Sequence, residues 1–272
     1  MRSLAVLGDS VAAGMGDPVP GGGWRGFAPL LADAVEPARF TNLASSGARV
    51  ADVRRAQLPA ALRVRPDAAV LMIGMNDTMR SDFDAPLLRR QLDHVVCSLV
   101  GAGAAVVTIR YHDHARVFPV PGPLRRLLTR RIEALNRVLT SVAESHGVAI
   151  VDLDRLPGAY HPDAWSVDRL HPSELGHRML AAAFAGGLAD QGVAVPSRVA
   201  LTCSGGVPVT RLDHVRWLLI KGVPWLAGRT GDLTRYSLIS LLRALFRRRR
   251  RATTAPAHVC PASESPQVWP AG

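Results

Sequence analysis

Short, uninterrupted apolar runs alternate with longer amphipathic segments along most of the chain. Such runs, without polar alternation, are typical of strands buried on both faces of a parallel sheet. They predict strands at residues 4–7, 68–74, 104–109 and 148–151, and we expect a further short strand at the more polar residues 39–44. The intervening segments predict helices at residues 27–32, 51–62, 86–100, 124–145 and 172–189. Strands and helices that alternate about every 30 residues indicate β-α-β units with right-handed crossovers, and hence an α/β fold.

Two of these helices carry more specific expectations. The helix at 86–100 has a broad apolar stripe that we expect to face the core, formed by Leu87, Leu88, Leu92, Val95, Val96 and Leu99. Cys97 lies within the same apolar pattern and is expected to be a small core residue. The helix at 172–189 is expected to hold Pro172 in its first turn, where the missing N–H of proline removes no hydrogen bond.

Polar clusters follow the predicted strands. Gly8-Asp9-Ser10 comes directly after the first strand, Ser46-Gly47 after the second, and Gly74-Met75-Asn76-Asp77 after the third. A fourth cluster, Asp168-Arg169-Leu170-His171, lies in the loop after the last strand. Because ligands bind outside the carboxyl ends of the strands in an open parallel sheet, we expect all four clusters to converge on one rim.

The residue types in these clusters fit acyl transfer. A serine hydroxyl is a weak nucleophile until a neighbouring histidine removes its proton, and that histidine needs a carboxylate to orient its ring. We therefore expect Ser10 to be the nucleophile, His171 its general base, and Asp168 the residue that orients His171. The backbone N–H groups of Ser10 and Gly47 and the side-chain amide of Asn76 are the expected donors to the oxyanion.

The acidic residues in these clusters allow other interpretations. One alternative is that Asp9 or Ser10 only caps the following helix. Another takes Asp9 and Asp77 as a glycosidase-like pair, in which two carboxylates flank the bond that is cleaved. We favour structural roles for both acids, in which they hydrogen-bond to the backbone and position the loops of Ser10 and Asn76.

The run His112-Asp113-His114 raises the question of a metal site. On an extended segment only its two histidines would point together, whereas a catalytic zinc site needs a third protein ligand, and spacing marks none. We therefore expect no metal and no cofactor, and we expect this loop to line the substrate pocket or to face solvent. Tyr111 and Met75 are candidates for the pocket wall, with ordinary packing as the alternative. His177, on the last predicted helix, is expected to be structural.

The four clusters match the signature blocks of a known family. The chain resembles the SGNH hydrolases, also called GDSL esterases/lipases, in Gly-Asp-Ser, Ala-Ser-Ser-Gly, Gly-Met-Asn-Asp and Asp-Arg-Leu-His, over about residues 3–190. This resemblance implies a flavodoxin-like three-layer α/β/α fold, a Ser10–His171–Asp168 catalytic set, no metal, and hydrolysis of ester or thioester bonds. The Gly-x-Ser-x-Gly elbow of the ordinary α/β-hydrolases is absent. An acyltransferase with the same site, and a non-catalytic membrane-surface or interaction protein, are the alternatives.

Charge and composition divide the chain into three parts. Residues 1–195 are the predicted catalytic domain, 196–251 a basic amphipathic extension, and 252–272 a disordered tail rich in Pro, Ala, Ser and Thr. Of the net charge of +11, residues 197–272 carry +9, with 12 Lys and Arg against 3 Asp and Glu. We expect the extension to pack on the catalytic domain or to contact an anionic membrane through residues 211–251. Nucleic-acid binding is disfavoured, because no base-stacking platform or base-reading module is recognisable.

Three widely spaced cysteines bear on where the protein resides. They offer no disulfide framework, which favours a reducing compartment. The chain shows no signal-peptide pattern and no apolar stretch of about 18 residues that would span a membrane. We expect a cytoplasmic protein, or one bound peripherally at the inner face of the membrane. The sequence leaves the oligomeric state undetermined.

Overall fold

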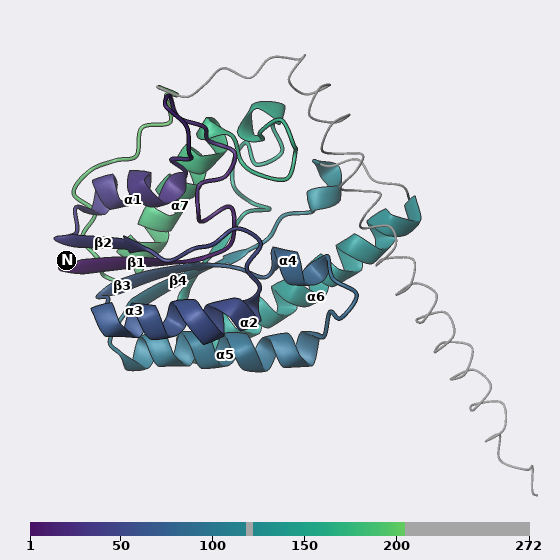
Figure 1. The fold of residues 1–272 in the computed structure, drawn as a ribbon, viewed down its shortest axis with the longest axis horizontal. Coiled ribbons are helices and arrows are strands. Elements are labelled where there is room, and N and C mark those ends of the chain that lie inside the picture. The colour runs from purple at the N-terminus through teal and green to yellow at the C-terminus, as the bar shows by residue number, and fades with distance from the viewer. Residues whose placement is uncertain (118–121, 205–272) are drawn as a thin grey trace, which may run out of the picture.

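A five-stranded parallel sheet lies between two layers of helices in the computed structural model, which describes residues 1–117 and 122–204 (Figure 1). The strands are β1 Ser3–Gly8, β2 Arg39–Asn42, β3 Ala68–Met72, β4 Ala105–Arg110 and β5 Ala149–Asp152. Their order across the sheet is β2-β1-β3-β4-β5, and every pairing is parallel. This is the flavodoxin-like strand order, so the expected three-layer fold is confirmed.

The two central strands form the most buried part of the sheet. Every residue of β1 and β3 is buried, as expected for unbroken apolar strands covered on both faces. They run side by side from Leu4 opposite Ala68 to Gly8 opposite Met72. The chain passes from β1 to β2 on one side and from β3 to β4 on the other. The crevice between β1 and β3 is therefore the topological switch point, where ligands bind in open α/β sheets.

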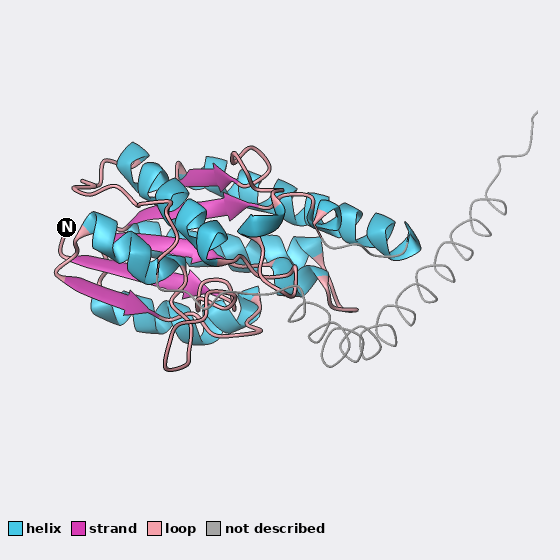
Figure 2. Cartoon of the chain, turned by 90° about the horizontal axis from the view of Figure 1, so that it is seen from above, coloured by secondary structure: helices cyan, strands magenta, loops and turns pink. Residues whose placement is uncertain are grey.

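Helices cover both faces of the sheet, and the five strands point the same way between them (Figure 2). On one face lie α1 (Phe27–Val35) and α7 (Glu174–Asp190), whose Phe27 and Phe184 rings are 4.9 Å apart between centroids. The other face carries α5 (Ala85–Gly101), α6 (Gly122–His146) and one continuous helical segment. That segment consists of α2 Val50–Asp52, the π-helical η1 Val53–Gln57 and α3 Leu58–Val64. Three short turns complete the described chain: α4 Met75–Thr78, and the 3₁₀ turns η2 His114–Arg116 and η3 Pro162–Ala164.

Three expectations about the helices are wrong in detail. α7 begins at Glu174 with Ser173 as its N-cap, so Pro172 lies outside the helix and pairs with Trp165 in a short antiparallel bridge. Leu87 and Cys97 are exposed, whereas the other members of the α5 stripe are buried. Each of the two lies next to a stripe residue in sequence, and one residue turns the side chain by about 100° around a helix.

The start of the predicted extension, residues 196–204, lies against the catalytic domain. The Ser197 backbone N–H donates to the Ala34 carbonyl of α1 at 3.1 Å, and Arg178 of α7 donates to the Ala200 carbonyl at 2.9 Å. The rest of the extension, including the arginine run, and the predicted disordered tail lie outside the described residues. The three-part division therefore stays a prediction. Within the described ranges, no helix has the length and hydropathy needed to cross a bilayer.

Candidate active site

Ser10 lies two residues beyond the end of β1, in a turn held against β3. A Cβ on Gly8 would come within 2.3 Å of the Met72 carbonyl oxygen, so only glycine allows the two strands to approach so closely here. The backbone N–H of Asp9 then donates to the same carbonyl at 3.3 Å. The turn that carries Ser10 is thus held at the switch point between β1 and β3.

Gln57 of η1 holds this segment from the other side. Its Oε1 accepts from the Gly8 N–H at 2.8 Å, and its Nε2 donates to the Gly8 carbonyl at 2.9 Å. The same Nε2 donates to the Ser45 hydroxyl at 3.3 Å. One buried side chain therefore joins the end of β1 to the loop that carries Gly47. It lies in a π-helical turn, a feature that is frequent at functional sites.

Asp168 and His171 lie together in the loop before α7. The Asp168 Oδ2 is 2.6 Å from the His171 Nδ1. The Asp168 Oδ1 accepts from the Ser166 hydroxyl at 2.7 Å and from the backbone N–H of Leu170 at 2.8 Å. Burial by itself would raise the pKa of Asp168, but His171 and these hydrogen bonds outweigh it and lower the pKa to about 2. The carboxylate is therefore ionised at neutral pH and held beside the ring.

His171 connects this loop to Ser10. Its Nε2 lies 2.8 Å from the Ser10 hydroxyl oxygen, while its Nδ1 faces Asp168. Gly16 packs against this loop at His171 and Pro172: with φ at +103°, a Cβ there would come within 2.1 Å of the Pro172 carbonyl and 2.9 Å of the His171 Cβ. The three residues expected to form the catalytic set thus lie in one hydrogen-bonded chain.

The two further oxyanion candidates follow β2 and β3. Gly47 has φ at +76°, a left-handed conformation that favours glycine, and a Cβ there would meet no atom within 4 Å. The space beside its Cα is therefore open. Asn76, in α4, donates one N–H of its amide to the Ala48 carbonyl at 3.0 Å. A primary amide has two N–H donors, so the second can be directed to a ligand.

Asp77 joins the loops of Gly47 and Asn76. Its Oδ2 accepts from the Val50 backbone N–H at 3.2 Å, and its Oδ1 accepts from the Arg49 Nε at 3.2 Å. Burial raises the pKa of Asp77, and the contacts with Val50 and Arg49 act in the opposite direction. These backbone and ion-pair contacts agree with the structural role that we favoured.

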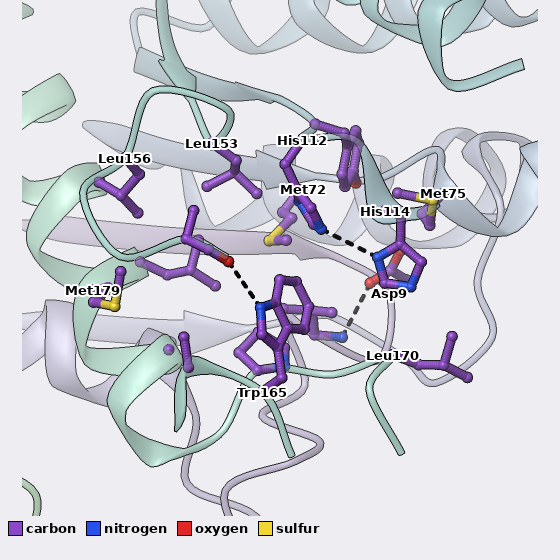
Figure 3. Close-up of a pocket in the computed structure, with 17 residues that line it drawn as sticks. Asp9, Met72, Met75, His112, His114, Leu153, Leu156, Trp165, Leu170 and Met179 are labelled. Atoms are coloured by element: carbon purple, nitrogen blue, oxygen red, sulfur yellow. Dashed lines mark hydrogen bonds between the residues drawn. The ribbon is translucent and has the colours of Figure 1, made fainter. Parts of the chain in front are cut away.

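Asp9 is buried beside Ser10 and faces a cavity. Its Oδ1 accepts from the Val11 backbone N–H at 3.1 Å, and burial raises its pKa to about 6. Met75 lines the same cavity (Figure 3), and Tyr111 is also among its lining residues, so the structure places both in a pocket wall. The contact between Asp9 and the backbone again agrees with a structural role.

His112 and His114 point toward each other in the wall of this cavity (Figure 3). The His112 Nε2 lies 3.2 Å from the His114 Nδ1. Burial lowers the pKa of His112 to about 3 and that of His114 to about 4, so both rings are neutral at pH 7. Of the two locations predicted for this loop, the structure favours the pocket. In the part of the chain that is described, no group of three or more His, Cys, Asp or Glu is placed to hold a metal ion.

His177 lies away from the catalytic loop, inside the core. Its Nδ1 accepts from the Phe27 N–H of α1 at 3.1 Å, and its Nε2 donates to the Met15 carbonyl at 3.0 Å. Burial lowers its pKa to about 4. Both ring nitrogens are thus used to join α7, α1 and the loop at 11–26, which is a structural arrangement.

The chain matches the model of the GDSL-like Lipase/Acylhydrolase family over residues 6–179. This match covers well over half of the chain and includes all four clusters. The chain belongs to this family. It is a serine esterase of the SGNH type, an enzyme that hydrolyses carboxylic ester bonds, as the signature blocks predict.

Curated relatives agree with this assignment, and solved structures agree with the fold. An acetylxylan esterase of Geobacillus stearothermophilus is 27% identical over 204 residues, which cover 67% of this chain and 92% of that protein. The GDSL-like esterase Rv1075c of Mycobacterium tuberculosis is 34% identical over 181 residues, 62% of this chain and 56% of that protein. Among solved structures, a lipase/acylhydrolase from Enterococcus faecalis has a TM-score of 0.56 at 23% identity, covering 73% of this chain and 100% of that one. At that identity the likeness shows the fold.

Three residues of the site escaped the sequence analysis. Ser166 lies two residues before Asp168, and its closeness to that acid was the available signal. Gln57 and Arg49 carry no local signal, because their partners Gly8 and Asp77 lie 49 and 28 positions away. Contacts over such separations depend on how the helices pack against the sheet.

Proposed function

We propose that the protein hydrolyses small carboxylic esters through an acyl-enzyme formed on Ser10. The observation that carries the proposal is the chain of contacts from Asp168 to His171 at 2.6 Å and from His171 to Ser10 at 2.8 Å. A serine in this arrangement becomes nucleophilic when the histidine takes its proton, and the carboxylate stabilises the imidazolium that forms.

The reaction has two halves. Ser10 Oγ attacks the ester carbonyl while His171 Nε2 takes the serine proton, and His171 then gives that proton to the departing alcohol. Water next attacks the acyl-enzyme with His171 again as the base, which releases the acid and restores Ser10. Asp168, with its pKa lowered to about 2, stays ionised and orients His171 throughout.

Charge develops on the carbonyl oxygen in both halves. The backbone N–H groups of Ser10 and Gly47 and the amide of Asn76 hold this oxyanion. The open space over Gly47 and the partly engaged amide of Asn76 support these roles. Donors fixed in advance at such an oxygen are worth far more in a water-excluded site than in water.

The substrate is a small ester, and a short acyl group is favoured. The relative from Geobacillus stearothermophilus is named an acetylxylan esterase, which supports an acetyl or another short acyl group. Thioesters would react through the same acyl-enzyme. Transfer of the acyl group to an alcohol instead of water would share the first half of the reaction, so the products distinguish a transferase from a hydrolase.

The experiment compares the purified protein with Ser10→Ala on p-nitrophenyl acetate and longer acyl homologues. We expect hydrolysis in the parent that falls by about a million-fold in the variant. A fluorophosphonate should label the parent at Ser10, and Ser145→Ala, which alters an exposed serine, should behave as the parent. Equal activity of the parent and Ser10→Ala would contradict the proposal. Acyl transfer to an added alcohol, with no free acid, would favour the transferase.

A further inference from the structure

A cavity of about 60 Å³ is lined by residues that flank Ser10 and His171 in the sequence. Asp9 and Val11, on either side of Ser10, line it, as do Leu170 and Pro172 on either side of His171. The ends of β3, β4 and β5, the loop at 156–165 and the first turns of α7 form most of the remaining walls. The cavity therefore begins where the acyl part of an ester bound at Ser10 would lie.

The walls of this cavity are mostly apolar. Met72, Leu153, Leu156 and Met179 contribute aliphatic or thioether surface, and Trp165 contributes its ring (Figure 3). The Trp165 indole N–H is already used, because it donates to the Ala159 carbonyl at 2.8 Å. The volume is several times the roughly 10–15 Å³ that a single water needs, which suits a short hydrocarbon chain.

Asp9 and Tyr111 bring polar atoms into this lining, and the Tyr111 hydroxyl has no hydrogen-bond partner among the described residues. His112 brings a further polar atom. The side chain is 3% exposed and lies in the cavity wall. Its Nε2 is engaged with His114 at 3.2 Å, but its Nδ1 has no hydrogen-bond partner among the described residues. Buried polar atoms are nearly always hydrogen-bonded, so an unpartnered one in a cavity wall indicates a polar atom on the occupant.

The His112–His114 contact limits what that polar atom is. If the His112 Nε2 donates to His114, its Nδ1 is a bare acceptor and the occupant must donate. If the His114 Nδ1 donates instead, the His112 Nδ1 carries the proton and the occupant must accept. A hydroxyl group donates and accepts, so it satisfies either tautomer.

We propose that this cavity binds the acyl chain of the ester, and that the His112 Nδ1 hydrogen-bonds to a hydroxyl group carried by that chain. The enzyme thereby prefers a short hydroxyacyl ester to the plain acyl ester of the same length. This inference rests on the proposed function, since it assigns the acyl subsite of that reaction. His112 acts here as a specificity-determining residue and takes no part in the bond changes.

The test measures kcat/KM for p-nitrophenyl butyrate and for the p-nitrophenyl esters of 2-hydroxybutyrate and 3-hydroxybutyrate. We expect one hydroxybutyrate to exceed butyrate by about tenfold, the factor that corresponds to one net hydrogen bond in a buried site. p-Nitrophenyl palmitate should be a poor substrate, because its chain exceeds the cavity.

Two substitutions separate the ring nitrogens of His112. In His112→Gln the amide reaches the place of Nε2 and leaves nothing at Nδ1, so the hydroxyl preference should fall to near unity. In His112→Asn the shorter amide stands at the place of Nδ1, so much of the preference should return. His94→Gln, at an exposed histidine on α5, serves as the matched control and should keep the parent's rates and preference.

Each outcome has a distinct meaning. Hydrolysis of butyrate without a preference for any hydroxybutyrate would overturn this inference and leave the proposed function standing. A preference that survives in a folded His112→Gln protein, as shown by its thermal unfolding, would also overturn it. Hydrolysis of none of these esters would overturn the proposed function and this inference with it.

Discussion

Two histidine sites lie at the carboxyl edge of the same sheet, and they differ in what supports each ring. His171 has a carboxylate 2.6 Å from one nitrogen and a serine hydroxyl 2.8 Å from the other, and its side chain is 15% exposed. His112 and His114 face each other in apolar walls, and burial lowers their pKa values to about 3 and about 4. The first site is built to stabilise an imidazolium, because an ionised carboxylate hydrogen-bonds to its ring.

The comparison teaches that burial and hydrogen-bond partners decide what a histidine does. In the proposed reaction, the ring held by Asp168 takes a proton from Ser10 and returns it. A ring held in an apolar wall stays neutral and offers a hydrogen bond instead. Four predictions, from the largest expected effect to the smallest, test this division.

The first prediction tests whether His171 is required for ester hydrolysis. We expect His171→Ala to lower kcat for ester hydrolysis by about 10⁴–10⁶-fold, because Ser10 then has no base to take its proton. Steady-state kinetics on p-nitrophenyl acetate measure this loss, with circular dichroism to verify the fold. A variant that retains a tenth of the parent's kcat would contradict the division.

The second prediction tests the role of the Asp168 carboxylate, which distinguishes the His171 site from the His112–His114 site. We expect Asp168→Asn to lower kcat by about 10⁴-fold, since an amide neither fixes the productive tautomer of His171 nor stabilises its cation. The measurement is kcat between pH 6 and 9 for the variant and the parent. Ser166→Ala, which removes one neutral hydrogen bond to Asp168, should lower kcat by only about tenfold. Equal losses of kcat in the two variants would indicate that catalysis depends on the conformation of the loop and not on the charge of Asp168.

The third prediction compares an asparagine expected to bind the oxyanion with one that has a structural role. We expect Asn76→Ala to lower kcat by about 10²–10³-fold with little change in stability, because its amide is the expected oxyanion donor.

The control is Asn136 of α6, whose amide oxygen and amide nitrogen are both bonded to the backbone of Tyr111. Its Oδ1 accepts from the Tyr111 N–H and its Nδ2 donates to the Tyr111 carbonyl, both at 2.8 Å. Asn136→Ala should therefore lower the free energy of unfolding by about 1–3 kcal/mol, as measured by urea denaturation. A stability loss in Asn76→Ala as large as in Asn136→Ala would argue against its catalytic role.

The buried histidines predict a modest pH dependence of stability. In the folded protein their pKa values lie below the ordinary 6.5, so between pH 6.5 and about 4 the unfolded chain binds more protons than the folded one. Stability is therefore fully present above pH 6.5 and falls as the pH drops, by at most about 1.4 kcal/mol per pH unit for each histidine. Urea denaturation at several pH values measures this slope, and His112→Asn should make it shallower. A slope identical to that of the parent would contradict the neutral state assigned to His112.

The failures of sequence interpretation occur at particular residues. Leu87 and Cys97 lie beside the buried stripe of α5. Periodicity alone did not separate them from the stripe, because consecutive residues are only about 100° apart around the helix axis. Pro172 is compatible with a first helical turn, yet Ser173 caps α7 and Pro172 pairs with Trp165. Local propensity allowed both arrangements, and the loop before α7 decided between them.

The sequence by itself determined the α/β architecture and the residues that gather at one rim of the sheet. Unbroken apolar runs specify buried parallel strands, and the chain direction places the residues after each strand at the same edge. Only the tertiary structure decided that His171 lies 2.8 Å from Ser10, that Gln57 clamps Gly8, and that His112 faces an apolar cavity. These contacts join segments far apart in the chain, so they depend on how helices and loops pack, which no local pattern encodes.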